Sequence, residues 1–356
     1  MFTDSYFDVE STSMHLADRD TTLMVNDDLD TVQQQCRLLS ILNKIVKSEA
    51  GAFGITKTES YKKTKTGDLL EEAVGGLTVL ENGIGEHQQL HPTIQLFSTT
   101  FKTHNLPEML ALWNTSPHEA DLINSWLKLF RTEVRSASHK RKLRYFQRAA
   151  GKNLSGALAY VDHLFEHHSR LLVIRVDLSY QKAIVKNNVV CADMTRLHRK
   201  RLFKRVQLHS LFEHCLGYIW KLEYGQYKGF HYHTCFLFDA SKARADVILA
   251  RRIGEFWINE ITEGKGLYFN CNAIANSYDQ SGIGDIHYTD HTKRNALKKA
   301  ITYLAKVDTA VRLTLPKGAR TFGRSEYVVR QGKKRGRPRL AVETTGSKSA
   351  GISKPD

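Results

Sequence analysis

Two histidines separated by one residue are the first candidates for chemistry in this sequence. His231 and His233 lie in the tract WKLEYGQYKGFHYHTCF (220–236), in a segment predicted to be a strand. Residues i and i+2 of a strand project from the same face of a sheet. Glu223 lies on the preceding predicted strand, and a tight hairpin would bring its carboxylate beside both imidazoles. Two imidazoles and a carboxylate are a plausible set of ligands for a divalent cation, although His-x-His pairs in strands are more often incidental.

A second group lies on a predicted helix near residue 300, in the segment NALKKAITYLAKVD. Its leucines and isoleucine form one apolar stripe that would pack on a sheet. Tyr303 and Lys306 lie on another side of this helix, one turn apart. A tyrosine next to a lysine is placed as a nucleophile would be, because the lysine favours the phenolate or neutralises charge on a phosphate. The structural alternative is a half-buried tyrosine beside a solvated lysine.

The elements that must position these residues are predicted from residue 153 onward. The apolar run LLVIRVDLSY (171–180) is a strand, and the two strands of the hairpin follow a basic helix. Helices are expected at 155–168, 193–212, 241–261 and 292–307, and strands at 171–180, 216–224, 230–238, 267–273 and 285–288. This succession of strands and helices, with a central hairpin, predicts an α+β domain built on an antiparallel sheet with flanking helices.

The N-terminal part is predicted to be mostly helical and has no motif that assigns a role. Helices are expected at 29–48, 92–104, 108–113, 118–134 and 139–148, whereas 49–89 has no clear period. The first 30 residues are acidic and are expected to be flexible. We therefore divide the chain into a helical region (1–150), a catalytic-type domain (153–310) and a basic tail (311–356).

The 356 residues include 52 Lys and Arg against 37 Asp and Glu, a net charge of +15. This excess predicts a polyanionic partner, because cations placed on phosphates release condensed counterions. No segment is apolar enough to span a bilayer, and five scattered cysteines without a CxxC pair fit a reducing cytoplasm. The absence of a P-loop motif implies that any helicase is a separate protein.

Two basic segments are candidates for holding phosphates. The tail segment KKRGRPRL resembles an AT-hook, whose Arg-Gly-Arg core lies in the minor groove, although a tail that only grips phosphates explains it equally well. The candidate DNA-binding residues are Arg196, Arg199, Lys200, Arg201, Lys204 and Arg205 of the predicted helix, and Lys333, Lys334, Arg335, Arg337 and Arg339 of the tail.

The order of the motifs resembles the HUH endonuclease superfamily, in particular its single-tyrosine rolling-circle replication initiators. The strand LLVIRVDLSY stands at the place of the first motif, Glu223, His231 and His233 match the metal motif, and Tyr303 with Lys306 match the catalytic helix. The segments GYIWKLEYGQYKGFHYHTCFLFD, ITYLAKVD and TFGRSE look like the inovirus replication initiators and their cryptic-prophage, YagK/YfjJ-like relatives. Positions 299 and 307 hold Lys and Val, so the second tyrosine of two-tyrosine members is absent.

The resemblance implies a ferredoxin- or RRM-like core and a metal-dependent nickase of a phage or prophage element. Mg²⁺ or Mn²⁺ would be held by the Glu and the two His. Tyr303 would form a 5′-phosphotyrosine on a single-stranded or supercoiled origin, with Lys306 assisting. A host polymerase would extend the free 3′-OH with the help of a host helicase. Water, a second protomer or a reused Tyr303 are open as routes for the closing transfer.

Two other functions stay open beside this one. A non-catalytic prophage regulator on a degenerate HUH fold would bind DNA without metal dependence or cleavage. A conjugative relaxase or transposase of the same superfamily fits less well, because relaxases place the tyrosine ahead of the histidine motif and such transposases are generally shorter. The origin sequence, the metal and the oligomeric state leave no trace in the sequence.

Overall fold

The computed structural model describes residues 34–57, 60–83, 87–106, 116–187, 189–225, 228–277, 281–313, 315 and 319–326. For residues 306–312 it describes the backbone but not the side chains. Three predictions lie outside the described residues: the flexible acidic start, the helix at 108–113 and the AT-hook-like tail.

An antiparallel sheet of six strands forms the centre of the fold. The strands are β4 (Arg170–Tyr180), β5 (Cys215–Gly225), β6 (Gly229–Asp239), β7 (Gly266–Asn270), β8 (Gly284–His287) and β10 (Phe322–Arg324). Their order is β10-β5-β6-β4-β7, and β8 also pairs with β4. The outer edge of β4 is thus shared, because β8 pairs with its first half and β7 with its second. Helices cover both faces of the sheet, as predicted for an α+β fold.

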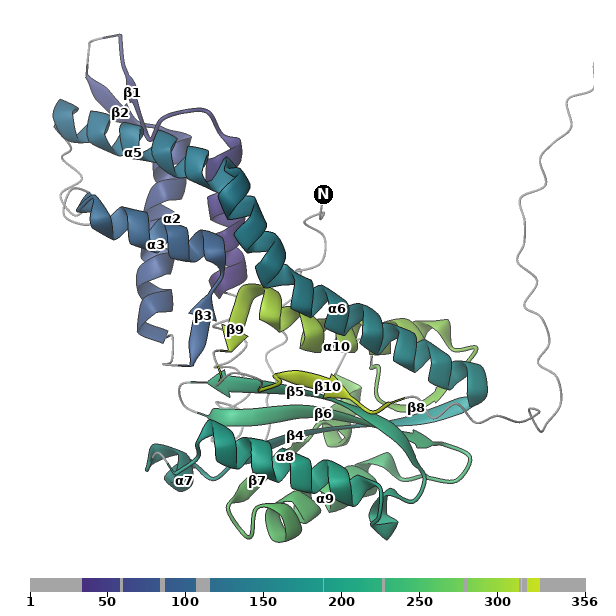
Figure 1. The fold of residues 1–356 in the computed structure, drawn as a ribbon. Coiled ribbons are helices and arrows are strands. Elements are labelled where there is room, and N and C mark those ends of the chain that lie inside the picture. The colour runs from purple at the N-terminus through teal and green to yellow at the C-terminus, as the bar shows by residue number, and fades with distance from the viewer. Residues whose placement is uncertain are drawn as a thin grey trace, which may run out of the picture. The chain divides into compact units, whose positions relative to one another are not determined.

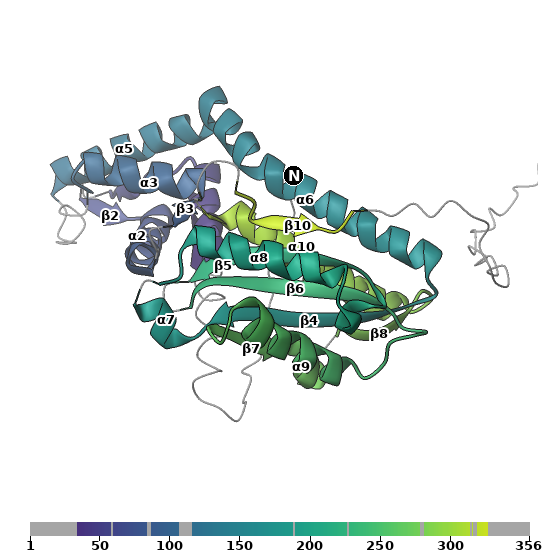
Figure 2. The ribbon, with the colours of Figure 1, turned by 60° about the horizontal axis from the view of Figure 1, so that its bottom comes forward.

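The helices α6 (Ala137–His167) and α10 (His291–Ala310) cover one face of the sheet, and α8 (Ala192–Val206) and α9 (Asp246–Phe256) cover the other (Figure 1 and Figure 2). Successive residues of each strand alternate between two apolar cores. On β4, Leu171 and Val173 pack with α6 and α10, whereas Leu172 and Ile174 pack with α8 and α9. Burial on both faces explains why LLVIRVDLSY is apolar nearly throughout.

The helix α6 is continuous where the sequence predicted two helices and a domain boundary. Gly151 lies in its interior, a position that costs about 1 kcal/mol relative to alanine. Packing at both ends outweighs this cost: Phe146 contacts the ring of His91, and Tyr160 is buried against the sheet. No helix in the described part of the chain combines the length and apolarity needed to cross a membrane.

The N-terminal region is helical, as predicted, and has its own apolar core. It consists of a helix at 34–47, α2 (Lys65–Gly83), α3 (Pro92–Thr103), α5 (Pro117–Arg135) and a hairpin of β1 (Phe53–Ile55) and β2 (Tyr61–Lys63). Ser116 and Glu119 form a capping box at the start of α5. The helix α2 was not predicted, because its paired glycines and threonines obscure the helical period, yet Leu70, Leu77 and Leu80 are buried.

A two-stranded ladder connects the N-terminal region with the end of α10. β3 (Gln88–Leu90) pairs with β9 (Val311–Leu313), which follows α10 directly. Gln88 Nε2 donates to the Tyr224 carbonyl (2.6 Å), and the ring of His87 lies 5.1 Å from that of Phe230. Residues 311–313 and 322–324, which the sequence analysis assigns to the tail, form the strands β9 and β10. The remaining short elements are α7 (Lys182–Lys186), η1 (Ser210–Phe212), η2 (Trp257–Ile261) and η3 (Cys271–Ser277).

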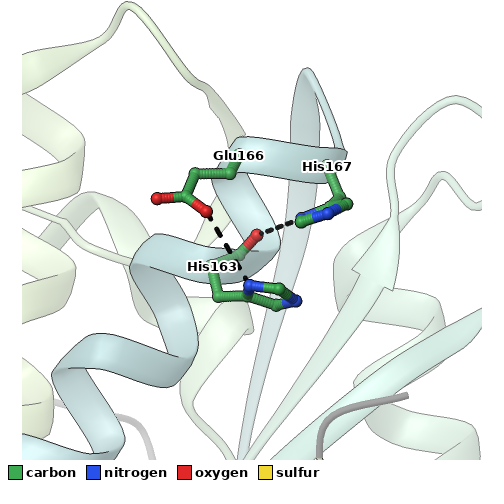
Figure 3. A group of neighbouring side chains, drawn as sticks. All are labelled: His163, Glu166 and His167. Carbon is green, nitrogen blue, oxygen red and sulfur yellow. Dashed lines mark hydrogen bonds and ion pairs between the residues drawn. The ribbon is translucent and has the colours of Figure 1, made fainter. Parts of the chain in front are cut away.

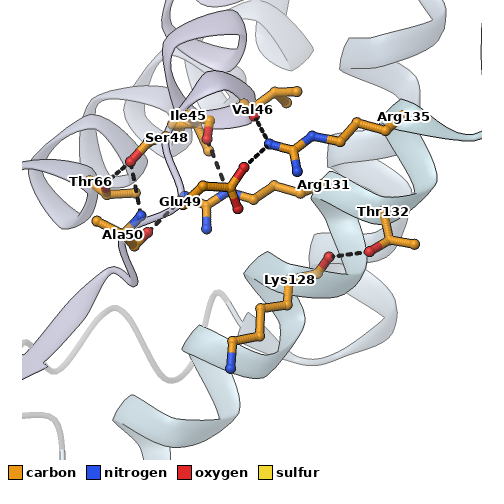
Figure 4. A network of polar contacts seen from close by, with 10 residues as sticks. All are labelled: Ile45, Val46, Ser48, Glu49, Ala50, Thr66, Lys128, Arg131, Thr132 and Arg135. Atoms are coloured by element: carbon orange, nitrogen blue, oxygen red, sulfur yellow. Dashed lines mark hydrogen bonds and ion pairs between the residues drawn. The ribbon is translucent and has the colours of Figure 1, made fainter.

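Arg131 of α5 ties the first helix to the N-terminal core, as Figure 4 shows. Its Nε donates to the Ile45 carbonyl (3.0 Å) and its Nη2 to the Ala50 carbonyl (2.8 Å), and the residue is only 4 % exposed. The carbonyls in the last turn of a helix have no partner within the helix. The guanidinium thus supplies a buried hydrogen bond to the Ile45 carbonyl and a partly buried one to the Ala50 carbonyl.

Arg131→Met should therefore lower the free energy of unfolding by about 1–3 kcal/mol, because it leaves the buried Ile45 carbonyl without its donor. Urea unfolding followed by circular dichroism measures this loss. Lys128→Met on the same helix is the control, since Lys128 is exposed. Equal midpoints for the two variants would show that the Arg131 hydrogen bonds contribute no net stability.

Candidate metal centre

The pairing of β5 with β6 brings the three predicted ligands together. Glu223 lies opposite His231, and the next inward pair in register on this face is Lys221 and His233. The turn between the strands ends at Gly229, whose φ of +64° and contact with Val185 disfavour any side chain. The hairpin that the sequence predicted is thus the element that assembles the site.

The ligand atoms of Glu223, His231 and His233 all lie within 4.8 Å of one another. Glu223 Oε2 is 3.3 Å from His233 Nε2 and 3.9 Å from His231 Nε2. The side chains are largely buried, with 11 % of Glu223, 3 % of His231 and 12 % of His233 exposed. They project from the same face as Ile219 and Cys235, which is the face that α6 and α10 cover.

Two details of this cluster fit a bound cation. Glu223 Oε1 is buried and makes no hydrogen bond, so one carboxylate oxygen remains to be satisfied. His231 Nδ1 donates to the Gly229 carbonyl (3.1 Å), because a carbonyl only accepts. A neutral His231 then carries its lone pair on Nε2, the nitrogen on the side of Glu223. A lone pair and a carboxylate facing each other are the arrangement that a cation would stabilise.

Asp177 of β4 is a fourth member of the cluster that the sequence analysis missed. It lies opposite His233 in the β4–β6 register, and its Oδ1 is 2.8 Å from His233 Nδ1. A carboxylate behind a histidine orients the ring and makes its other nitrogen a better metal ligand. The signal in the sequence was the pair of charges, Arg175 and Asp177, in an otherwise apolar strand; their link to the histidines needed the strand order.

Burial and charge pairing shift the pKa values of the cluster in opposite directions. Burial alone would lower the pKa of His233, but the carboxylates of Asp177 and Glu223 outweigh it and raise that pKa to about 10. Burial would raise the pKa of both carboxyls, yet the imidazolium of His233 holds each below its ordinary value, with Arg175 acting on Asp177 as well. Without a cation the protein thus balances two carboxylates with a proton on His233. A metal ion would take over that positive charge.

Tyr303 lies on α10, on the same face of the sheet as this cluster, and is half-buried. Arg294 and Lys298 of this helix bond to Asp162 of α6, at 3.0 and 2.9 Å. At 3.6 residues per turn, Tyr303 lies about 140–180° around the helix from these two residues. It is therefore on the flank of α10 that points away from α6. Lys306 lies in the same helix, but its side chain is outside the described residues.

The end of α10 lies near the hairpin through the β3–β9 ladder. β9 follows α10, β3 pairs with β9, and Gln88 of β3 bonds to the carbonyl of Tyr224, the neighbour of Glu223. The helix thus runs toward the end of the sheet that carries the candidate ligands. The structure brings together the three ligands and places the tyrosine helix on their face.

The predicted basic helix is α8, and it lies on the opposite face of the sheet. Leu202 and Phe203 belong to the core formed with α9, away from the histidines. Arg199 stacks over Trp220 at 4.2 Å and bonds to the Arg320 carbonyl (3.0 Å), and Arg201 pairs with Glu263 (2.7 Å).

Arg196 pairs with Asp193 at the surface of α8 (3.0 Å), and Lys200, Lys204 and Arg205 are exposed. Several of the predicted phosphate contacts therefore already serve the fold, and the rest lie away from the candidate centre. The five tail residues at 333–339 lie outside the described residues.

Comparison with known proteins gives a match to one family model, the YagK/YfjJ C-terminal domain, over residues 132–325. No curated protein and no solved structure matches the chain. The matched segment contains α6, the whole antiparallel sheet and α10, and thus every described residue of the candidate centre. It makes up more than half of the sequence, and the chain therefore belongs to the YagK/YfjJ family through this C-terminal domain.

Proposed function

We propose that this protein is a metal-dependent DNA nickase that starts rolling-circle replication of a phage or prophage element. The observation that carries the proposal is the group of Glu223, His231 and His233 on one hairpin, with their ligand atoms within 4.8 Å. Membership of the YagK/YfjJ family and the order of the motifs, which resembles single-tyrosine HUH initiators, support it.

Glu223, His231 and His233 would hold Mg²⁺ or Mn²⁺, and Asp177 would orient His233. A divalent cation held there would polarise the scissile phosphate and offset its charge. Mn²⁺ fits the two imidazoles better than Mg²⁺, which prefers oxygen ligands. Three protein ligands leave coordination positions for phosphate oxygens, so the site suits a phosphodiester better than a purely structural ion.

Tyr303 would be the nucleophile. Its phenolic oxygen would form a bond to phosphorus while the bond from phosphorus to the 3′ oxygen breaks. The protein is then joined to the 5′-phosphate, and the departing 3′ oxygen takes up a proton to become the 3′-OH that a host polymerase extends. The phenolic proton would pass to water or to Lys306, one turn along α10.

The contacts to DNA would come from two sides of the domain. Arg175 and Lys228 act on the carboxylate of Asp177, and Lys221 acts on that of Glu223, so these cations lie near the candidate centre. Lys200, Lys204 and Arg205 of α8 face solvent on the other side of the sheet. We propose that these three residues and the basic tail bind the DNA backbone at positions distant from the scissile phosphate. A host helicase would separate the strands.

Replacing the nucleophile should abolish the covalent product. We expect Tyr303→Phe to form no denaturation-resistant adduct with single-stranded oligonucleotides that tile the DNA flanking the gene, in the presence of Mn²⁺. Gel electrophoresis under denaturing conditions detects the adduct. Tyr145→Phe is the matched control and should react normally, because Tyr145 is 74 % exposed on α6. An adduct formed by Tyr303→Phe would show that another residue is the nucleophile.

The same assay separates the nickase from a DNA-binding regulator. A regulator on a degenerate fold would bind some of these oligonucleotides, or their duplexes, with no adduct and no dependence on Mn²⁺. That result for the unmodified chain would overturn the proposed function.

Removing one ligand should separate cleavage from binding. His231→Ala should lose Mn²⁺-dependent cleavage, because the remaining two ligands bind the ion weakly. It should keep salt-sensitive binding to DNA, which rests on basic residues elsewhere. Cleavage assays and fluorescence anisotropy at two salt concentrations measure the two effects. Cleavage at the unmodified rate would contradict the metal assignment.

Asp177 should act through His233. Asp177→Asn keeps the shape but removes the charge behind the ring, and we expect Mn²⁺ affinity to fall about 10–100-fold. Higher Mn²⁺ concentrations should then restore the cleavage rate, a readout that a folding defect would not produce. Asp193→Asn, at the exposed start of α8, is the control. Unchanged Mn²⁺ affinity in Asp177→Asn would remove Asp177 from the site.

A further inference from the structure

A second group of metal-binding residue types lies on the last turns of α6, outside the site described above. The segment HLFEH (163–167) places His163, Glu166 and His167 at i, i+3 and i+4. Residues with this spacing lie on one face of a helix, about one turn apart. The buried residues Leu164 and Phe165 lie between them in sequence and pack into the core, so the three polar side chains share the outer side of the helix.

Figure 3 shows the three side chains beside one another on α6, with Glu166 joined to the ring of His163 and His167 joined to the His163 carbonyl. The rings of His163 and His167 have their centroids 4.2 Å apart, and His163 Nδ1 is 3.7 Å from Glu166 Oε2. Each residue offers one ligand atom, and the three atoms lie within 4.8 Å of one another. These separations are close to those between ligands that share one metal ion, so only small rotations of side chains are needed.

A hydrogen bond prepares His167 as a ligand. Its Nδ1 donates to the His163 carbonyl (2.9 Å), because a carbonyl oxygen only accepts. A neutral His167 therefore carries its lone pair on Nε2, and the ring is held in one orientation. Metal-binding histidines commonly show this arrangement, in which the second nitrogen bonds to a carbonyl or carboxylate.

The position of the group on α6 also favours a cation. His167 is the last residue of the helix, where the carbonyl dipoles leave a partial negative charge. The side chain of His163 is half-buried, with 29 % exposed, and that of Glu166 is 67 % exposed, so ions in solution can reach the group. A cation bridging residues 163 and 167 would also hold the last turn of α6, just before β4, the strand that carries Asp177.

We propose that His163, Glu166 and His167 form a second metal site, for an imidazole-preferring divalent cation such as Zn²⁺ or Ni²⁺. Two imidazoles and one carboxylate favour these ions over Mg²⁺, which takes oxygen ligands. Three protein ligands leave a position for water. The site is independent of the proposed nuclease centre, which lies on β5 and β6 and is largely buried.

The test is a Zn²⁺ titration of the full chain after chelator treatment and dialysis, followed by calorimetry. All proteins carry His231→Ala, which removes a ligand of the hairpin centre. In this background, His163→Gln with His167→Gln should bind one equivalent fewer of Zn²⁺, or bind it at least about tenfold more weakly. His118→Gln, an exposed histidine at the start of α5, is the control and should leave the binding unchanged.

Two further measurements sharpen the outcome. Glu166→Gln should weaken Zn²⁺ binding several-fold, since it removes the charged ligand but keeps its shape. Zn²⁺ should raise the thermal unfolding midpoint of the parent and not that of the double histidine variant, and circular dichroism in the absence of metal verifies that both are folded. Equal stoichiometry and affinity in the parent and the double variant would overturn the proposal. An unchanged affinity in Glu166→Gln would overturn the role of the carboxylate.

Discussion

The antiparallel pairing of β5 with β6 is the constraint on which the rest of the candidate centre depends. Its register sets Glu223 opposite His231. A slip of one residue would turn one strand's polar side chains to the opposite face, into the core under α8 and α9. The apolar residues that alternate with them, such as Tyr232 and Phe236, are buried in that core and make such a slip costly. The core on one face thus maintains the arrangement of the candidate ligands on the other.

The third strand turns this hairpin into a charge-balanced cluster. β4 places Asp177 beside His233, so that a buried imidazole is flanked by carboxylates on both neighbouring strands. Burying such groups is costly unless they are paired. The cluster meets this condition with a proton on His233 in the absence of a metal, and a metal ion would meet it equally. A cluster of this kind can fold without a bound ion.

The two faces of the sheet differ in the residues that they carry. The face under α6 and α10 carries the candidate ligands and the tyrosine helix, and the face under α8 and α9 is apolar almost throughout. The long helix α6 packs on the sheet with its second half and on the N-terminal region with its first. It therefore connects the sheet with the N-terminal region, and His163 and His167 lie at its C-terminal end.

Local patterns were enough to predict the elements that carry the centre. The strands β4, β5 and β6 begin and end within one residue of the prediction, because they are long runs rich in apolar residues and glycines mark the turn of the hairpin. The continuous α6 and the strands β9 and β10 were not predicted, since Gly151 and the short segments near residues 312 and 323 have weak local preferences. Their conformations depend on packing against distant residues, as Trp220 shows by its pairing with Gly323.

The sequence by itself determined the types of the candidate ligands and their spacing: a two-residue period puts His231 and His233 on one face, and a short turn brings Glu223 to them. Only the tertiary structure decided that Asp177 lies behind His233 and that α8 lies on the other face. The reason is physical. Spacing along one strand or hairpin follows from backbone geometry, whereas the choice of neighbouring strand and of the covered face follows from the burial of two separate apolar cores.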